Sequence, residues 1–297
     1  MTDIPFPRST RYDQPDGSGR ETARWRWFRR GPQFRQRRPA LTPGLRRLWK
    51  VGGVLWVLVA LPFGAMQVAT TLAHTRETVV KEFPAAGVTG VDIGNGNGSV
   101  TVVGSDTPVV RVTARISHGW ARTGNDVELV DGRVRADTHC PVFFTQFCSV
   151  AYTVEVPRTM ALTVDSDNGS VFASDLTGDV TLSSDNGRVE AERLDGDLRL
   201  SSSNGRVSGR DLRADGVEAD SSNGRIELSF VEPPRVVGAS SSNGEVDIVV
   251  PDDRTTYRVD AGADNGSVSV VVDQSRRSDN VITASSDNGA VSVRYAE

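Results

Sequence analysis

The sequence has few of the residues that carry enzyme chemistry or fill a thick hydrophobic core. Of its 297 residues only two are Cys and three are His. None of the histidines (His74, His118 and His139) lies in a recognisable nucleophile or zinc motif. Aromatic residues make up 6%, which is lean for a thick layered core and favours thin, finely packed β structure. With 24% charged residues, the chain is not disordered as a whole.

Positive charge is concentrated at one end of the chain. Residues 1–50 contain 13 Arg and Lys against four Asp and Glu, whereas the remaining residues contain 21 against 34. A basic head and an acidic body rarely share one compartment or one partner. The acidic body argues against a nucleic-acid-binding domain, because phosphate contacts need clustered Arg and Lys. We therefore expect no nucleic acid among the partners.

A long uncharged segment follows the basic head. Residues 51–73 contain no charged side chain, and a helix of that length covers the roughly 30 Å hydrocarbon layer of a bilayer. The sequence predicts one transmembrane helix over residues 51–74, with the lipid bilayer as its partner. Because Arg46, Arg47 and Lys50 precede it, we expect a single-pass protein of the cell membrane with a cytoplasmic N-terminus and an extracytoplasmic C-terminal domain. A cleaved signal peptide is the alternative.

The head itself has no hydrophobic periodicity. Residues 1–50 are rich in Pro, Gly and Arg and are predicted to form a disordered basic cytoplasmic head. Arginines interleaved with aromatic residues form a candidate site for anionic lipid of the inner leaflet. These arginines are Arg24, Arg26, Arg29 and Arg30. The alternative is that they only orient the protein in the membrane.

An internal repeat dominates the rest of the chain. The dipeptide Asn-Gly recurs, and its last seven Asn are separated by 18, 18, 19, 20, 22 and 23 residues. A period near 20 is typical of a solenoid or another β array. The seven residues are Asn168, Asn186, Asn204, Asn223, Asn243, Asn265 and Asn288.

Each repeat unit alternates between apolar or small residues and polar ones. In one unit Leu200 and Ser202 precede Asn204 by four and two residues, and Val207 follows it by three. This period of two predicts a strand on each side of the Asn. The Asn lies an even number of residues after the inward-facing Leu and Ser, so we expect its side chain to point toward the core. It lies at a bend, where the following Gly would tolerate positive φ. Stacked at about 4.8 Å per rung, the Asn side chains would form a structural ladder, and the preceding Ser a second one.

The predicted fold class is therefore all-β, a single-stranded β-solenoid or β-helix with rungs of 18–23 residues. The competing interpretation is a meander of antiparallel hairpins with Asn-Gly turns. A second, looser corner in each unit, such as residues 195–197 or 233–234, favours the closed coil. We expect an N-terminal β region with a disulfide loop at 75–160, and the Asn-Gly solenoid at 161–297.

The two cysteines lie close together in the predicted extracytoplasmic part. Cys140 and Cys148 enclose seven residues and are predicted to form a disulfide, which bacterial exteriors permit. Metal binding with His139 is the alternative, but two Cys and one His make an incomplete ligand set. The loop contains three phenylalanines, which would either cap the end of the solenoid or present an aromatic binding patch. They are Phe143, Phe144 and Phe147.

The repeat resembles a known family. The segments Asp165–Val171 and Ser183–Val189, their later copies and a degenerate first copy at Gly94–Val100 are similar to the bacterial putative-adhesin family of membrane-tethered β-strand repeat proteins. The similarity covers about residues 90–297. It implies a surface-exposed β-solenoid, with adhesion or envelope-stress response as the functions proposed for relatives.

These observations predict a non-catalytic, adhesin-like binding or scaffold module at the cell envelope, whose partner is an envelope protein or polysaccharide. One alternative is an envelope-stress sensor that couples the solenoid to the cytoplasmic head. Another is a polysaccharide-acting β-helix enzyme that uses outward carboxylates, for example Asp165 with Asp167 or Asp264 with Asp287. Calcium at these corners is conceivable, but the nonapeptide pattern of calcium-binding β-rolls is absent. We expect no catalytic residue, no cofactor and no metal.

Overall fold

The computed structural model describes residues 43–72, 75–118, 124–139 and 148–296. One helix, α1 (Pro43–Leu72), precedes the strands. Within the described residues the strands form two sheets. The all-β prediction is therefore confirmed for the described residues that follow the helix.

Both sheets are long and are built from short strands. Sheet A contains, in spatial order, β1 (Thr75–Pro84), β4 (Val109–His118), β7 (Ser149–Pro157), β3 (Val100–Ser105), β9 (Val171–Ser174), β11 (Val189–Glu192), β13 (Val207–Leu212), β15 (Ile226–Phe230), β17 (Val246–Val250), β21 (Val291–Tyr295) and β19 (Val268–Val271). Sheet B contains, in spatial order, β18 (Arg258–Ala263), β20 (Val281–Ser286), β16 (Val236–Ser241), β14 (Gly216–Ser221), β12 (Leu198–Ser202), β10 (Val180–Ser184), β8 (Ala161–Asn168), β2 (Gly90–Asn97), β6 (Arg133–His139) and β5 (Gly124–Val130).

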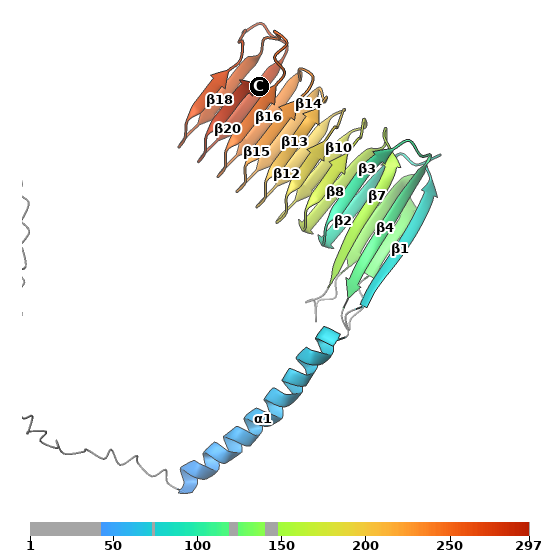
Figure 1. The fold of residues 1–297 in the computed structure, drawn as a ribbon, viewed down its shortest axis with the longest axis vertical. Helices are drawn as coiled ribbons and strands as arrows, with labels where there is room; N and C mark the ends of the chain where they lie inside the picture. The colour runs from blue at the N-terminus through green and yellow to red at the C-terminus, as the bar shows by residue number, and fades with distance from the viewer. Residues whose placement is uncertain (1–42, 73–74, 119–123, 140–147, 297) are drawn as a thin grey trace, which may run out of the picture. The chain divides into compact units, whose positions relative to one another are not determined.

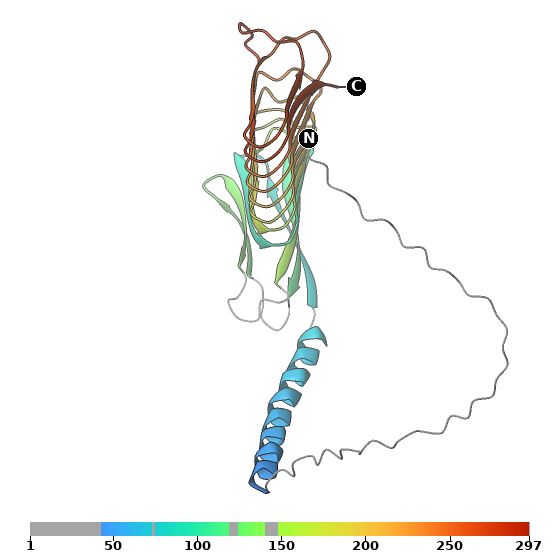
Figure 2. The ribbon, with the colours of Figure 1, turned by 90° about the vertical axis from the view of Figure 1, so that its left-hand side faces the viewer.

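From β8 onward the chain alternates between the two sheets, so that one strand of each sheet makes one rung of a coil (Figures 1 and 2). Neighbouring rungs pair in parallel and in register. For example, Leu182 lies opposite Val164 on one side and Leu200 on the other. The hairpin meander is wrong for the Asn-Gly repeats, because it requires antiparallel neighbours.

The coil begins before the predicted solenoid boundary at residue 161. Strands β2 and β3 form a first rung that pairs in parallel with β8 and β9, and Asn97 lies opposite Asn168. Strands β7 and β6 extend the two sheets beyond this rung by parallel pairing with β3 and β2. Antiparallel pairs follow them, β7 with β4 and β4 with β1 in sheet A, and β6 with β5 in sheet B. The N-terminal β region is therefore continuous with the repeats.

The N-terminal end is closed by contacts between the two sheets. The Tyr152 hydroxyl donates to Asn125 Oδ1 at 2.6 Å, and burial raises the pKa of this phenol to about 12. Lys81 Nζ donates to the carbonyl oxygen of Val127 at 2.7 Å. A charged side chain at this edge discourages pairing with another chain.

The last two rungs are out of sequence order. Strand β16 pairs with β20, and β18 lies outside β20 at the edge of sheet B. In sheet A, β21 likewise lies between β17 and β19. The chain therefore passes over one rung position, forms the outermost rung, and returns to fill the position that it left (Figure 1).

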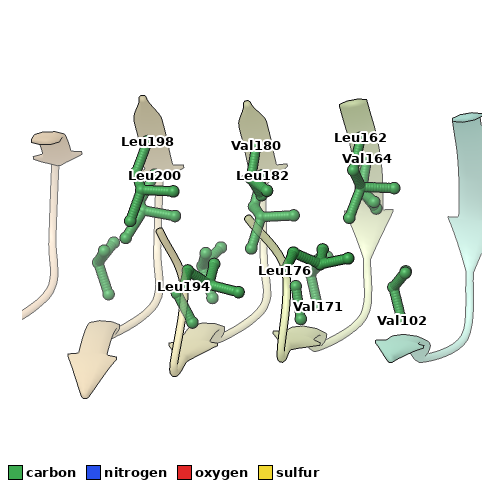
Figure 3. Close-up of a cluster of buried hydrophobic side chains, with 14 of the residues drawn as sticks. Val102, Leu162, Val164, Val171, Leu176, Val180, Leu182, Leu194, Leu198 and Leu200 are labelled. Carbon is green, nitrogen blue, oxygen red and sulfur yellow. The ribbon is translucent and has the colours of Figure 1, made fainter. Parts of the chain in front are cut away.

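The core is a narrow stack of aliphatic side chains between the sheets (Figure 3). Leu182 and Leu200 come from sheet B, Val171 comes from sheet A, and Leu176 and Leu194 come from the second corner, all at most 1% exposed. Burying one such side chain fully contributes roughly 1.5–3 kcal/mol. This stack therefore dominates the stability of the coil.

Helix α1 forms over most of the segment that was expected to cross the membrane. No helix in the described part of the chain combines the length and the apolarity that crossing a membrane requires.

Candidate binding surface

The Asn side chains of the repeats form one hydrogen-bonded ladder along the coil. Except at Asn168, whose Nδ2 donates to the carbonyl oxygen of Gly96 at 3.2 Å, each Nδ2 donates to the Oδ1 of the Asn in the neighbouring rung, at 3.0 to 3.2 Å. Most of these amides also donate to a backbone oxygen of that rung, as Asn204 does to Asp185 at 3.2 Å. The spatial order of the ladder is Asn168, Asn186, Asn204, Asn223, Asn243, Asn288 and Asn265.

The ladder does not follow sequence order at its end, because Asn288 binds Asn243 and Asn265 binds Asn288. One expectation about these residues is wrong. The Asn side chains do not point into the core, since all seven residues are exposed. The strand alternation that predicted burial ends at the bend, so the parity no longer applies there.

The glycine after each Asn is required by close approach between rungs. A Cβ on Gly205 would lie 1.9 Å from the carbonyl oxygen of Gly187, and one on Gly187 equally close to that of Gly169. The expected reason, positive φ, applies only to Gly98, with φ 124°. The stacking of backbones, and not the local turn, therefore excludes every other residue.

The Ser two residues before the Asn forms the buried ladder beneath the bend in six of the seven repeats, and Ala263 takes its place before Asn265. Ser202 Oγ donates to the carbonyl oxygen of Gly187 at 2.9 Å, and Ser241 Oγ to that of Gly224 at the same distance. These serines are at most 6% exposed. Ser166 is an exception, because its buried hydroxyl has no hydrogen-bond partner among the described residues. The carbonyl oxygen that it would meet, that of Gly98, accepts Asn95 Nδ2 instead.

The outer face of sheet B carries a polar trough beside the Asn ladder. It has a volume of about 300 Å³ and crosses β10, β12, β14 and β16. One file of lining residues comes from the strands: Ser183, Ser201, Asp220 and Ser240. A second file comes from the positions just before the Asn: Asp185, Ser203, Ser222 and Ser242. We call these eight residues the serine trough.

Several hydroxyls of the serine trough are free to bind a ligand. Ser183 Oγ donates to Asp165 Oδ1 at 2.5 Å, and Ser203 Oγ to Asp185 Oδ1 at 3.4 Å. The hydroxyls of Ser201, Ser222 and Ser242 have no protein partner in the described part of the chain. The trough therefore offers donors and acceptors at the regular spacing of the rungs.

The trough also contains one carboxyl group in an unusual environment. Burial, and secondarily the charge of Glu218, raise the pKa of Asp220 above its usual value. Glu218 in turn lies 3.2 Å from Arg199 Nε on the neighbouring rung. Among the described residues, no group of three or more His, Cys, Asp or Glu is placed to hold a metal ion.

The outer face of sheet A differs, because Arg and acidic residues pair across its rungs. In one file just after the bend, Ser170 is followed by Arg188, Arg206 and Arg225. Arg206 Nη1 lies 3.9 Å from Glu227 Oε2, and Arg225 Nη1 lies 3.5 Å from Glu227 Oε1. The charges on this face bind one another, whereas the serine trough leaves polar groups free.

The second corner carries a ladder of alternating charge that the sequence analysis missed. Asp175, Arg193 and Asp211 all have left-handed backbone, with φ 61°, 52° and 53°. Arg193 donates from Nε and Nη2 to the two carboxylate oxygens of Asp175, at 2.9 and 3.0 Å. These hydrogen bonds lower the pKa of Asp175. Asp175, Arg193 and Asp211 each lie seven residues after an Asn of the repeat. This constant offset is the sequence signal that could have identified the ladder.

Some predicted site residues fall outside the described part of the chain. The candidate lipid-binding residues Arg24, Arg26, Arg29 and Arg30 lie there, as does Cys140. Cys148 is buried, with 8% exposed. The disulfide and the lipid site both stay predictions.

A family model described as Toastrack DUF4097 matches residues 126–296. Solved structures to which the chain is similar include a putative adhesin from Bacteroides fragilis, 14% identical over 74% of this chain and 97% of that one, with a TM-score of 0.43. Another is a putative cell adhesion protein from Clostridium sporogenes, 11% identical over 75% of this chain and 100% of that one, with a TM-score of 0.34. A third is a putative lipid binding protein from Parabacteroides distasonis, 11% identical over 74% of this chain and 97% of that one, with a TM-score of 0.38. No curated protein matches the chain.

Proposed function

Because the chain belongs to the Toastrack DUF4097 family, we propose that it is a non-catalytic, adhesin-like binding module, and that the serine trough is its binding surface. The observation that carries the proposal is the trough itself, in which four consecutive rungs present hydroxyl and carboxylate groups along a volume of about 300 Å³. Its free hydroxyls keep their full capacity to donate and accept hydrogen bonds.

The ligand that fits this surface is an extended polymer. Successive rungs repeat every 4.8 Å or so, which places equivalent polar groups at constant intervals along the trough. A polysaccharide of the cell envelope offers hydroxyls at similarly regular intervals. Many weak polar contacts would add up along its length, as in multivalent binding.

The test compares two Ser→Arg substitutions in the full-length protein. Ser203→Arg places a bulky cation in the serine trough, whereas Ser170→Arg extends a file that already contains Arg188, Arg206 and Arg225. Co-sedimentation with insoluble cell-wall polysaccharide is the measurement. We expect Ser203→Arg to weaken binding about tenfold or more, which corresponds to the loss of one or two polar contacts, and Ser170→Arg to bind as the unchanged protein does.

Equal binding by both variants would place the ligand elsewhere. Release of new reducing ends from the polysaccharide would instead reveal an enzyme. The activity of Asp220→Asn would then show whether this carboxyl group, whose pKa is raised, takes part in the reaction.

We also propose that α1 attaches this module to the cell membrane, with residues 1–50 in the cytoplasm and the sheets outside. Residues 51–73 contain no charge, and Trp49, Leu55 and Trp56 are 64–74% exposed. We expect the protein to stay with the membrane fraction through an alkaline carbonate wash and to be released by deletion of residues 51–73. Release of the full-length protein by the wash would contradict the attachment.

A disulfide between Cys140 and Cys148 belongs to the same proposal, because it requires an oxidising exterior. Peptide mapping of the protein from cells, without reduction, is expected to recover the two cysteines in one linked peptide. Recovery of both as alkylated thiols would remove this support for an exterior location.

A further inference from the structure

Asn265 occupies a special position in the Asn ladder. It belongs to the outermost rung, in which β18 and β19 each have a strand neighbour on one side only among the described residues. Its Nδ2 makes one hydrogen bond, to Asn288 Oδ1 at 3.2 Å. Its own Oδ1 accepts none in the described part of the chain, because no further rung lies beyond it.

The interior members of the ladder are held much more firmly. Asn204 Nδ2 donates to Asp185 O at 3.2 Å and to Asn186 Oδ1 at 3.1 Å. Its Oδ1 accepts Asn223 Nδ2 at 3.0 Å. Turning this side chain out of the ladder therefore breaks three hydrogen bonds, against one for Asn265.

Asn-Gly sequences are chemically labile when the side chain can turn toward the following backbone nitrogen. We propose that Asn265 is a site of selective deamidation in the folded protein, and that the ladder protects the interior Asn-Gly sequences. The Gly266 nitrogen makes no backbone hydrogen bond in the described part of the chain. The same holds for the Gly205 nitrogen after Asn204, so the two sites differ in the hydrogen bonds of the Asn side chain and not in those of the following nitrogen.

The reaction needs only water as a co-reactant. The Gly266 backbone nitrogen attacks Cγ of Asn265 and forms a new C–N bond. The Cγ–Nδ2 bond breaks, and the departing nitrogen takes the Gly266 amide proton and leaves as ammonia. Water then opens the succinimide at either carbonyl, which gives aspartate or isoaspartate at position 265.

The product changes the outer rung. An ionised carboxylate cannot donate to Asn288 Oδ1, so the ladder bond of that rung is lost. The new charge also joins Asp264 and Asp287, which precede the Asn of the two outer rungs. Like charges on neighbouring strands repel, so deamidation loosens the edge of the coil where Val268 and Val271 are already 45% and 64% exposed.

The experiment incubates the full-length folded protein in neutral buffer at physiological temperature and maps its tryptic peptides by mass spectrometry. Peptide Val259–Arg276 contains Asn265 as its one Asn-Gly, and Leu200–Arg206 contains Asn204. The two additional hydrogen bonds at Asn204 predict conversion at least roughly tenfold slower than at Asn265. In urea the two sites should convert at rates within a few-fold of each other, because the ladder is absent.

Two results would overturn the inference. One is equal conversion of both peptides in the folded protein. The other is a folded protein in which Asn265 does not convert, while the same site converts in urea.

Discussion

The Asn-Gly bend and the second corner of each rung differ in how much they vary along the coil. From β10 onward, every bend joins sheet B to sheet A over the same number of residues, and in the repeats Asn, Gly and a following Val or Ile recur at fixed positions. The second corner lengthens from 175–179, between β9 and β10, to 272–280, between β19 and β20. Most of the growth in repeat length therefore falls at the second corner.

The difference follows from what each bend must contact. At the Asn-Gly bend each glycine touches the backbone of the neighbouring rung, so one additional atom cannot be accommodated. At the second corner, paired side chains such as Arg193 with Asp175 join the rungs, and longer loops leave the strand register unchanged. One bend fixes the register of the rungs, and the other allows them to differ.

The largest expected effect comes from adding a Cβ to the constant bend. Gly205→Ala places that atom 1.9 Å from the carbonyl oxygen of Gly187, and we expect a loss of about 3 kcal/mol or more in the free energy of unfolding. Gly238→Ala, where nothing lies within 4 Å, is the control and should change stability by about 0.5–1 kcal/mol at most. Urea unfolding measures both, and equal effects would show that the rungs do not approach so closely.

A smaller effect is expected from the buried hydroxyls beneath the same bend. Ser202→Ala leaves the carbonyl oxygen of Gly187 without its hydroxyl donor and should cost about 1–2 kcal/mol. Ser166→Ala removes a buried hydroxyl that has no partner among the described residues, so it should be neutral or stabilising. A larger loss for Ser166→Ala than for Ser202→Ala would refute the serine ladder.

The smallest effect is expected at the second corner. Arg193→Ala removes a half-exposed ion pair, worth about 1 kcal/mol or less. Arg193→Gly should be less harmful than Arg193→Ala, because glycine adopts the left-handed backbone without strain. Equal unfolding free energies for the two variants would mean that the backbone at this position is unstrained.

The same pair makes a prediction about pH. The folded pKa of Asp175 is depressed by its hydrogen bonds to Arg193, so the stability that it contributes is present above its unfolded pKa and is lost as the pH falls through the folded value. Unfolding titrations below about pH 4 should therefore show a shallower loss of stability for Arg193→Ala than for the unchanged protein. A parallel pH dependence would show that the pair is not formed in solution.

Much of this fold follows from the sequence, because a coil with constant bends repeats its residues at constant offsets. The period of two around each Asn and the recurring Ser and Val predicted parallel stacking, and the resemblance to a putative-adhesin family of β-strand repeat proteins is confirmed. The reason for the glycines was missed because it lies between rungs and is invisible within one unit. The order of the last two rungs was missed because Asn265 and Asn288 lie in similar units, and similarity does not reveal which unit is inserted.

The serine trough was within reach of the sequence only in part. The recurring Ser identified a ladder, but which hydroxyls are used by the backbone and which stay free depends on contacts between rungs. Ser202 and Ser203 are adjacent in the sequence, yet one is buried against a carbonyl oxygen and the other lines the trough. Alternation predicts the two faces of a strand but not the partners on each face.

Disulfide trapping between strands tests the stacked coil and its rung order most directly. Gly238 lies opposite Thr283 on the adjacent strand, whereas Asp260 lies one rung further away, at about 10 Å, beyond the roughly 7 Å that a disulfide spans. The double variant Gly238→Cys with Thr283→Cys is predicted to form a linked peptide on mild oxidation, and Gly238→Cys with Asp260→Cys is predicted to stay unlinked. Efficient linkage of the second pair and not the first would contradict the account.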